Sequence, residues 1–276
     1  LNAAQIASAF LVAPATMGQR LVRAKTKIRD AGIAFELPEE KDLPSRLAAV
    51  LEAIYAAYTN AWETVDGGDP RHRGLAEEAI WLARLCVQLM PTEPEARGLL
   101  ALMLYCESRR DARRTSNGSY VPLLQQDTSL WSQTAIAEAE KELALSATFK
   151  QLGRFQLEAA IQSIHAQRAI AQKVNWQALA LLYAGLIQIS PTLGALVSHA
   201  AAIAEAQGIE EGLMHLKAIP LESVKNYQPY WALKAHLFKQ LGAKSDAKQA
   251  YARAIGLTED SAIREFLLKQ SLPLED

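Results

Sequence analysis

The sequence has little of what builds disulfide scaffolds or parallel sheets. Its 276 residues include 2 cysteines and 9 valines, against 49 alanines and 39 leucines. Short runs of valine and isoleucine are typical of buried strands, whereas alanine and leucine favour helices. Half of the residues are hydrophobic and the formal net charge is −1, which excludes collagen-like and disordered chains. We therefore expect an all-α globular protein.

Membrane spans and secretion signals are also missing from the sequence. No apolar run reaches the roughly 18 residues that a membrane-spanning helix requires, and we expect no signal peptide before Leu1. The two cysteines, Cys86 and Cys106, lie in apolar helical patterns without a CxxC motif or a nearby histidine. We expect small buried residues in a cytoplasmic protein rather than zinc ligands. Because the chain begins with leucine, we also expect it to be part of a longer protein.

Catalytic motifs are absent as well. The sequence has no HExxH, GxSxG or GxGxxG motif and no phosphate-binding glycine loop. Its histidines are scattered along the chain, at His72, His165, His199, His215 and His236. We therefore expect no enzymatic activity, no metal ion and no cofactor.

The small net charge hides an uneven distribution. Residues 1–30 carry five basic groups and one acidic group, whereas the remainder carries 24 basic and 29 acidic residues. A basic head on an acidic body indicates two surfaces with different partners. The plainer interpretation is a solvated helix end.

The basic head has the signals of two helices. Residues 2–10 form the first, with Asn2 as N-cap. Residues 14–30 form the second, since Pro14 suits a first helical turn and Gly32 suits a helix end. Its apolar positions share one face: Met17, Leu21, Ala24 and Ile28.

The remainder of the chain has the pattern of successive helices. Residues 33–46 contain two prolines and a charged run, which is typical of a linker. Apolar residues from Leu47 to Trp62 then recur at helical spacing. Further helices are expected at about 74–90, 93–112, 129–147, 156–171, 175–189, 192–207, 209–217, 229–241, 244–256 and 259–270. Asn117-Gly118 predicts a small hairpin turn in the loop between two of them.

The end of the chain repeats with a 34-residue spacing, because Gly208 and Gly242 each separate two expected helices. Small residues and one aromatic follow Gly242 at the positions of a tetratricopeptide unit, namely Ala247, Tyr251 and Ala254. The sequence therefore predicts a superhelical array of helix hairpins, an architecture that binds partners. Five tryptophans are spread one per helix region, which is typical of core anchors: Trp62, Trp81, Trp131, Trp176 and Trp231.

Residues 4–7 (AQIA) and 16–24 (TMGQRLVRA) resemble the helix-turn-helix that closes the −35-reading domain of bacterial sigma factors. Gln5 stands where that family commonly has an acid, and Leu11 where it usually has the turn glycine. The similarity is to extracytoplasmic-function (ECF) sigma factors with a C-terminal tetratricopeptide-like extension. It continues through EAIWLARL (78–85), GLLALML (98–104), SRRDAR (108–113), QDTSLW (126–131) and QLEAAI (156–161).

The resemblance implies three parts. Residues 1–32 would be the C-terminal part of sigma domain 4, residues 33–46 a linker, and residues 47–276 a helical extension. The implied function is transcription initiation, with promoter DNA as one partner and, in the full-length protein, the RNA polymerase core as another. The extension would regulate activity in place of an anti-sigma protein, through a regulatory protein or a small ligand.

The second helix of such a pair enters the major groove with its N-terminal residues against base edges. Ala15, Thr16, Gln19 and Arg20 fall there, and arginine and glutamine can bind guanine and adenine bidentately. Arg23, Lys25 and Lys27 would lie nearer to phosphates. A plain helical hairpin is the alternative that residue pattern alone leaves open.

A second group of residues flanks the loop after the helix at 93–112. One hypothesis makes it a ligand or partner pocket, with arginine for an anion, tryptophan for stacking and histidine as a proton-sensitive contact: Arg109, Arg113, Asp127, Trp131 and His165. The favoured alternative is an Arg–Asp ion pair that pins the loop, with His165 in the core. For the whole chain, the alternative to a sigma factor is a tetratricopeptide-like scaffold without DNA binding.

Overall fold

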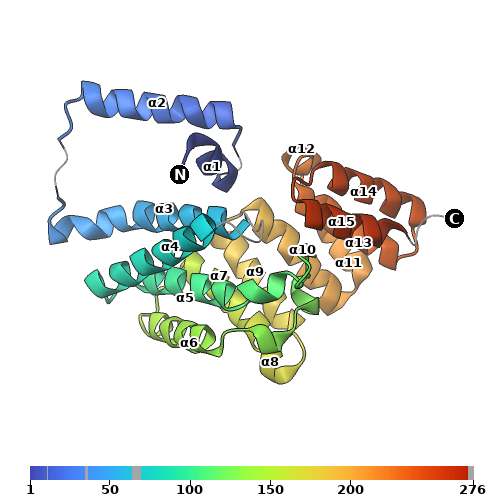
Figure 1. The fold of residues 1–276 in the computed structure, drawn as a ribbon. Coiled ribbons are helices and arrows are strands. Elements are labelled where there is room, and N and C mark those ends of the chain that lie inside the picture. The colour runs from blue at the N-terminus through green and yellow to red at the C-terminus, as the bar shows by residue number, and fades with distance from the viewer. Residues whose placement is uncertain (11, 35–36, 64–69, 273–276) are drawn as a thin grey trace.

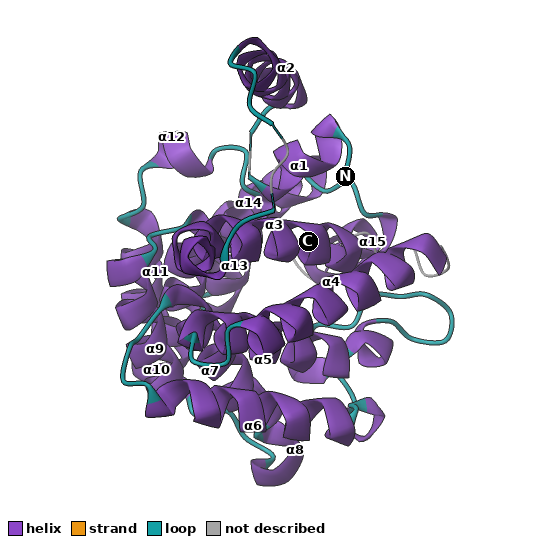
Figure 2. Ribbon diagram, turned by 90° about the vertical axis from the view of Figure 1, so that its left-hand side faces the viewer, coloured by secondary structure: helices purple, strands orange, loops and turns teal. Residues whose placement is uncertain are grey.

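The computed structural model describes residues 1–10, 12–34, 37–63 and 70–272. All regular elements in these ranges are helical, and the one β-bridge among them is isolated (Figures 1 and 2). The expected all-α class is confirmed. None of the helices in the described ranges combines the length and apolar character needed to cross a lipid bilayer.

The helices follow one another with short connections. Those of the first half are α1 (Ala3–Ala9), α2 (Pro14–Asp30), η1 (Glu40–Asp42), α3 (Leu43–Glu63), α4 (Pro70–Leu89), α5 (Pro94–Ser108), η2 (Arg110–Arg113), η3 (Leu123–Gln125), η4 (Thr128–Leu130) and α6 (Gln133–Thr148). Those of the second half are α7 (Arg154–Ala166), α8 (Arg168–Ala171), α9 (Trp176–Ile189), α10 (Leu193–Gln207), α11 (Ile209–Lys217), α12 (Leu221–Val224), α13 (Gln228–Gln240), α14 (Lys244–Gly256) and α15 (Ser261–Ser271).

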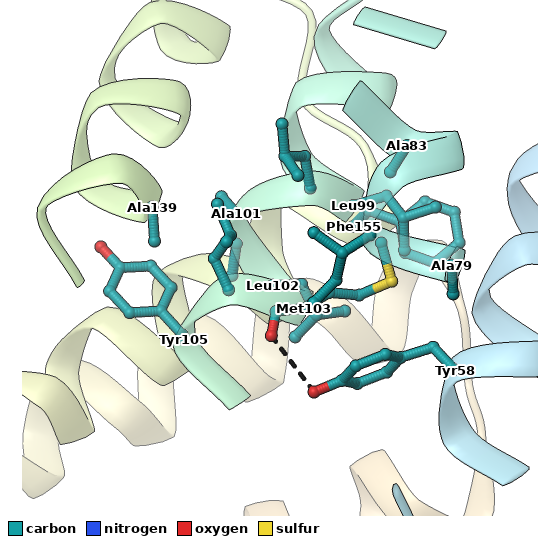
Figure 3. Packing of buried hydrophobic residues seen from close by; sticks show 14 of the residues in the cluster. Tyr58, Ala79, Ala83, Leu99, Ala101, Leu102, Met103, Tyr105, Ala139 and Phe155 are labelled. Atoms are coloured by element: carbon teal, nitrogen blue, oxygen red, sulfur yellow. Dashed lines mark hydrogen bonds between the residues drawn. The ribbon is translucent and has the colours of Figure 1, made fainter. Parts of the chain in front are cut away.

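Helix α5 is the centre of the first half of the fold. Its sequence is apolar on all sides, and Leu99, Ala101 and Met103 are almost fully buried. A helix that is hydrophobic all round has to be covered on all sides, and α5 packs on α4, α6 and α7. Figure 3 shows this core, in which the hydroxyl of Tyr58 on α3 donates a hydrogen bond to the carbonyl of Met103 at 3.2 Å.

In the second half of the fold, each of the longer helices packs on its neighbours. Helix α7 packs on α9, α9 on α10, α10 on α11, and α13 on α14. The last hairpin has the small residues expected of a tetratricopeptide unit, since Ala235, Ala247 and Ala254 are fully buried at the crossing. Gly242 turns the chain between its two helices with φ +72°, a conformation that favours glycine.

The loop after α5 closes back on the end of the chain. Arg114 and Tyr120 pair as an isolated antiparallel bridge, so the hairpin turn predicted at Asn117-Gly118 is present. Arg114 forms an ion pair with Asp260 at 2.5 Å, and Tyr120 packs edge-to-face on Phe266 of α15. The loop after α5 therefore contacts the last helix, α15, from its start at Asp260 to Phe266.

Two local expectations were wrong, and one short helix was not expected. The linker was predicted to extend to residue 46, but α3 begins at Leu43 because Pro44 is accommodated in a first helical turn. Trp81 was predicted to be a core anchor, but on α4 it is 54% exposed. The short α12 was not predicted, since four residues carry too little pattern to identify a helix.

Candidate nucleic-acid interface and neighbouring sites

Helix α1 is stabilised at its start by two reciprocal hydrogen bonds. The backbone N–H of Gln5 donates to the Asn2 side chain at 2.9 Å, and the backbone N–H of Asn2 donates to the Gln5 side chain at 2.8 Å. This is a capping box, which satisfies N–H groups that a helix end leaves unpaired. Glutamine at position 5 therefore has a structural role, although it departs from the acid common in sigma factors.

Helix α2 covers the expected residues, from Pro14 to Asp30. Gly32, with φ +60°, ends it, and the N–H of Ile33 reaches back to the carbonyl of Ile28 at 3.2 Å. Such a bond around a left-handed glycine is typical of a Schellman ending. Both ends of this helix are thus set by local sequence.

The two helices meet at a small contact, and most of α2 remains exposed. Ala7 of α1 is fully buried, and within α2, all of whose residues the structure describes, only Met17 is buried. The apolar face predicted for α2 is therefore covered only at its first turns, since Ala24 and Ile28 are exposed. Helix α2 packs on α1 and α1 on α3, so α2 lies at the edge of the molecule (Figures 1 and 2).

All seven residues proposed to contact DNA are exposed on α2: Ala15, Thr16, Gln19, Arg20, Arg23, Lys25 and Lys27. Thr16, Arg20, Arg23 and Lys27 are spaced at i, i+4, i+7 and i+11, so they share one face about 16 Å long. Arg29 is the only basic group of α2 with an acidic neighbour among the ion pairs of the described residues, bonding to Asp30 at 3.2 Å. The exposed face is therefore strongly cationic.

A separate group of arginines surrounds the ring of Trp62 at the end of α3. The guanidinium carbons of Arg113, Arg110 and Arg109 lie 4.0, 5.3 and 5.7 Å from its centroid. Arg113 also donates to the Trp62 carbonyl at 2.6 Å, and Arg109 donates to the Gln162 side chain at 2.8 Å. Burial and then the charge of Arg109 lower the pKa of Arg113 to about 10.

His165, Trp131 and Arg168 form the neighbouring part of this region. His165 packs edge-to-face on Trp176, and burial followed by the charges of Arg109 and Arg168 lowers its pKa to about 4. Arg168 lies 5.1 Å from the ring centroid of Trp131, which is 4% exposed. The imidazole is therefore neutral at physiological pH.

Asp127 lies outside this group. Its side chain is exposed, and it accepts the N–H of Ser129 at 2.9 Å at the start of a short helical turn. Hydrogen bonds from Ser129 lower its pKa. The loop is held instead by Arg168, whose guanidinium donates to the carbonyls of Leu124 and Gln126. A backbone carbonyl carries no sequence signal, so this contact could not have been predicted.

Two cavities among the described residues have volumes of about 560 and 610 Å³, and neither of these two is lined by Arg109, Asp127 or His165. The larger, which we call the inner groove, has about 610 Å³ and is lined by residues of α3, α5, α7, α9 and α10. Arg154 lies in it and bonds to Glu52 and Glu158, each at 2.7 Å. Phe10, at the end of α1, also lines the inner groove, so the helix pair reaches its edge.

Two sequence comparisons give matches, one over part of the chain and one over nearly all of it. Residues 46–147, from α3 to α6, match the model of a family of unknown function (DUF6596). The chain is also 36% identical over 270 residues to an uncharacterized protein of Rhizobium meliloti (strain 1021). That match covers 98% of this chain and 64% of the relative, so the chain spans less than two thirds of the relative's length. Neither description states an activity.

Proposed function

We propose that this chain is the C-terminal part of an ECF-type sigma factor. In this proposal α1 and α2 read the −35 element of a promoter, and the helical array regulates activity through a protein or a ligand. The observation that carries the proposal is the exposed cationic face of α2, on a helix that rests on the array through α1.

Charge supports the same division of roles. A cationic helix attracts the phosphate backbone, whereas the array carries an excess of acidic residues and would be repelled by it. DNA would therefore approach α2 and avoid the array. Arg20 and Gln19 would contact base edges, and Arg23 and Lys27 would contact phosphates.

The test is DNA binding by the full-length protein and by this chain. Duplexes selected from a random library supply the preferred sequence, and fluorescence anisotropy gives affinity over a range of salt concentrations. Affinity should fall steeply with salt, with a slope of log K against log salt of about −0.9 for each phosphate contact. Arg20→Ala should relax sequence choice, whereas Arg46→Ala, an equal charge change at an exposed position of α3, should leave it unchanged.

A second candidate function is a protein-interaction scaffold without DNA binding. The observation that favours it is the inner groove, which lies among five helices and presents both charged and aromatic side chains. Under this function, DNA affinity would be weak, insensitive to sequence and equal in the Arg20→Ala and Arg46→Ala variants. Sequence selectivity, compared between the Arg20→Ala and Arg46→Ala variants, therefore separates the two functions.

A further inference from the structure

The inner groove contains an unequal number of positive and negative side chains. Among the described residues that line it, three carry a charge: Glu52 of α3, and Arg154 and Glu158 of α7. The Arg154 guanidinium donates through Nη1 to one carboxylate oxygen of Glu52 and through Nε to one oxygen of Glu158, each at 2.7 Å. One guanidinium balances only one of the two carboxylates, so the lining of the groove carries a net negative charge.

Glu52 is the carboxylate that a ligand can reach. The Glu158 side chain is 17% exposed, and it also hydrogen-bonds with the Tyr55 hydroxyl, whose pKa is raised by burial and then by the Glu158 charge. The Glu52 side chain is 42% exposed, and among the described residues its one hydrogen-bond donor is Nη1 of Arg154, which contacts Oε1. The second oxygen of Glu52, Oε2, is therefore left for a further donor.

The arginine cluster around Trp62 lies too far along α3 to neutralise this charge. Trp62 follows Glu52 by ten residues of one helix, which places their Cα atoms about 15 Å apart. At physiological salt, charges at accessible sites are screened over about 8 Å. Arg109 is the member of the cluster that contacts a lining residue, and it donates to the Gln162 side chain at 2.8 Å. The negative charge at Glu52 therefore remains effective.

Aromatic rings form a further part of the wall. Phe10, Tyr55, Tyr183 and Tyr227 line the groove, and the guanidinium carbon of Arg154 already lies 5.4 Å from the ring centroid of Tyr55. The face of an aromatic ring attracts cations, and proteins bind organic ammonium ions in this way. Burial raises the pKa of Tyr183, so its hydroxyl is neutral and leaves the charge of the lining unchanged.

We propose that the inner groove binds a small organic cation, an amine with an apolar body, whose ammonium group donates to Oε2 of Glu52 and whose body lies against the aromatic rings. The cavity volume of about 610 Å³ is within the range of small-molecule sites. Phe10, at the end of α1, borders the groove, which leaves less room for an extended peptide. The inference goes beyond the proposed function and does not depend on DNA binding by α2.

The experiment compares three probes that share a phenylalkyl body and differ in charge. The cation is 4-phenylbutylamine, the neutral probe is 4-phenylbutan-1-ol, and the anion is 4-phenylbutanoate. Titration calorimetry measures their affinities for the full chain, and NMR chemical-shift changes locate the site. We expect the amine to bind about tenfold more tightly than the alcohol, as for one hydrogen bond to a charged group, and the anion to bind more weakly than the alcohol. The shift changes should map to α3, α7 and α9.

Three variants make the result specific. Glu52→Gln removes the charge and keeps the shape, so it should reduce the preference for the amine over the alcohol to less than twofold. Glu77→Gln, the same change at an exposed position of α4 outside the groove, should preserve the tenfold preference. Phe10→Ala removes an apolar wall without changing any charge, so it should weaken the amine and the alcohol by the same factor. A thermal melt of each variant establishes that it is folded.

The proposal is overturned if no probe binds the folded chain, if the amine binds no more tightly than the alcohol, or if the shift changes map elsewhere. A tenfold preference that survives Glu52→Gln also overturns it. A capped five-residue peptide with a central lysine carries the same ammonium group on a peptide. If that peptide binds tenfold more tightly than the amine, the groove is a peptide site and the small-molecule assignment is wrong. None of these outcomes bears on promoter binding, which is measured separately.

Discussion

Gly98 of α5 faces the backbone of Gln156 on α7 so closely that a Cβ atom at position 98 would lie 2.7 Å from the Gln156 nitrogen. Real Cβ atoms do not approach a backbone atom that closely. The absence of a side chain at Gly98 lets the backbones of α5 and α7, which pack extensively on one another, approach closely where they cross. It also positions α7, which contributes to both cavities.

Gly98→Ala should therefore destabilise the protein. Forcing a methyl group into a tight crossing costs about 1–3 kcal/mol, although alanine is the better helix former. Gly74→Ala is the matched control, since Gly74 lies within α4 and has open space around it. The control should be stabilised by about 1 kcal/mol. Urea unfolding measures both, and equal effects would contradict the crossing argument.

Glu95→Ala should loosen the start of α7. The Glu95 carboxylate, on α5, accepts the backbone N–H groups of Phe155 and Gln156 at 2.9 and 3.1 Å. Losing this cap should cost about 1–2 kcal/mol, and hydrogen exchange at these two amides should accelerate. Glu77→Ala, at an exposed position of α4, is the control. Unchanged exchange in the Glu95 variant would refute the prediction.

We expect the free energy of unfolding to fall in acid because of His165. Burial, then Arg109 and Arg168, lowers its pKa from 6.5 to about 4 in the folded protein. Because the unfolded state takes up the proton first, stability is lost as pH falls from about 6.5 to 4. The loss at pH 5.0 relative to pH 7.5 should be about 2 kcal/mol.

The His165 effect is isolated by comparing the protein with a His165→Gln variant in urea titrations at both pH values. The variant should lack this part of the pH dependence. His215→Gln, a change at a half-exposed histidine, should retain it. A parallel loss of stability in the protein and the His165 variant would rule out this assignment.

The Arg114–Asp260 pair should couple the loop to α15. Burial acts to raise the pKa of Asp260, but backbone N–H groups of α15 and the Arg114 guanidinium hold it below its usual value. A double-mutant cycle with Arg114→Ala and Asp260→Asn should give a coupling of about 1 kcal/mol. Additive effects would mean that the pair does not stabilise this contact.

Much of the fold follows from local signals. Helix α2 begins at Pro14 and ends before Gly32 as expected, because both residues act through their own backbone angles. The last hairpin was also predictable, since the small residues and the turn glycine recur at a fixed spacing. A predicted helix boundary was wrong where the local signal was ambiguous. Pro44 is an example, because proline suits either a loop or a first helical turn.

The candidate sites were predictable only in part. The exposed basic face of α2 follows from helical spacing, and all seven of its residues are exposed. The expected pairing of Asp127 with an arginine did not form in the structure, where Arg114 pairs with Asp260 instead, 146 residues along the chain. Sequence proximity to a loop does not specify such a partner, because the packing of helices that are distant in the sequence brings the two residues together.

The sequence by itself determined that this protein is helical, where most of its helices lie, and that its positive charge gathers on α2. Those properties depend on composition, periodicity and residues that act locally. Only the tertiary structure decided which helices cross at Gly98, where the two cavities lie, and that Arg114 pairs with Asp260. These depend on contacts between distant helices, which no local pattern encodes.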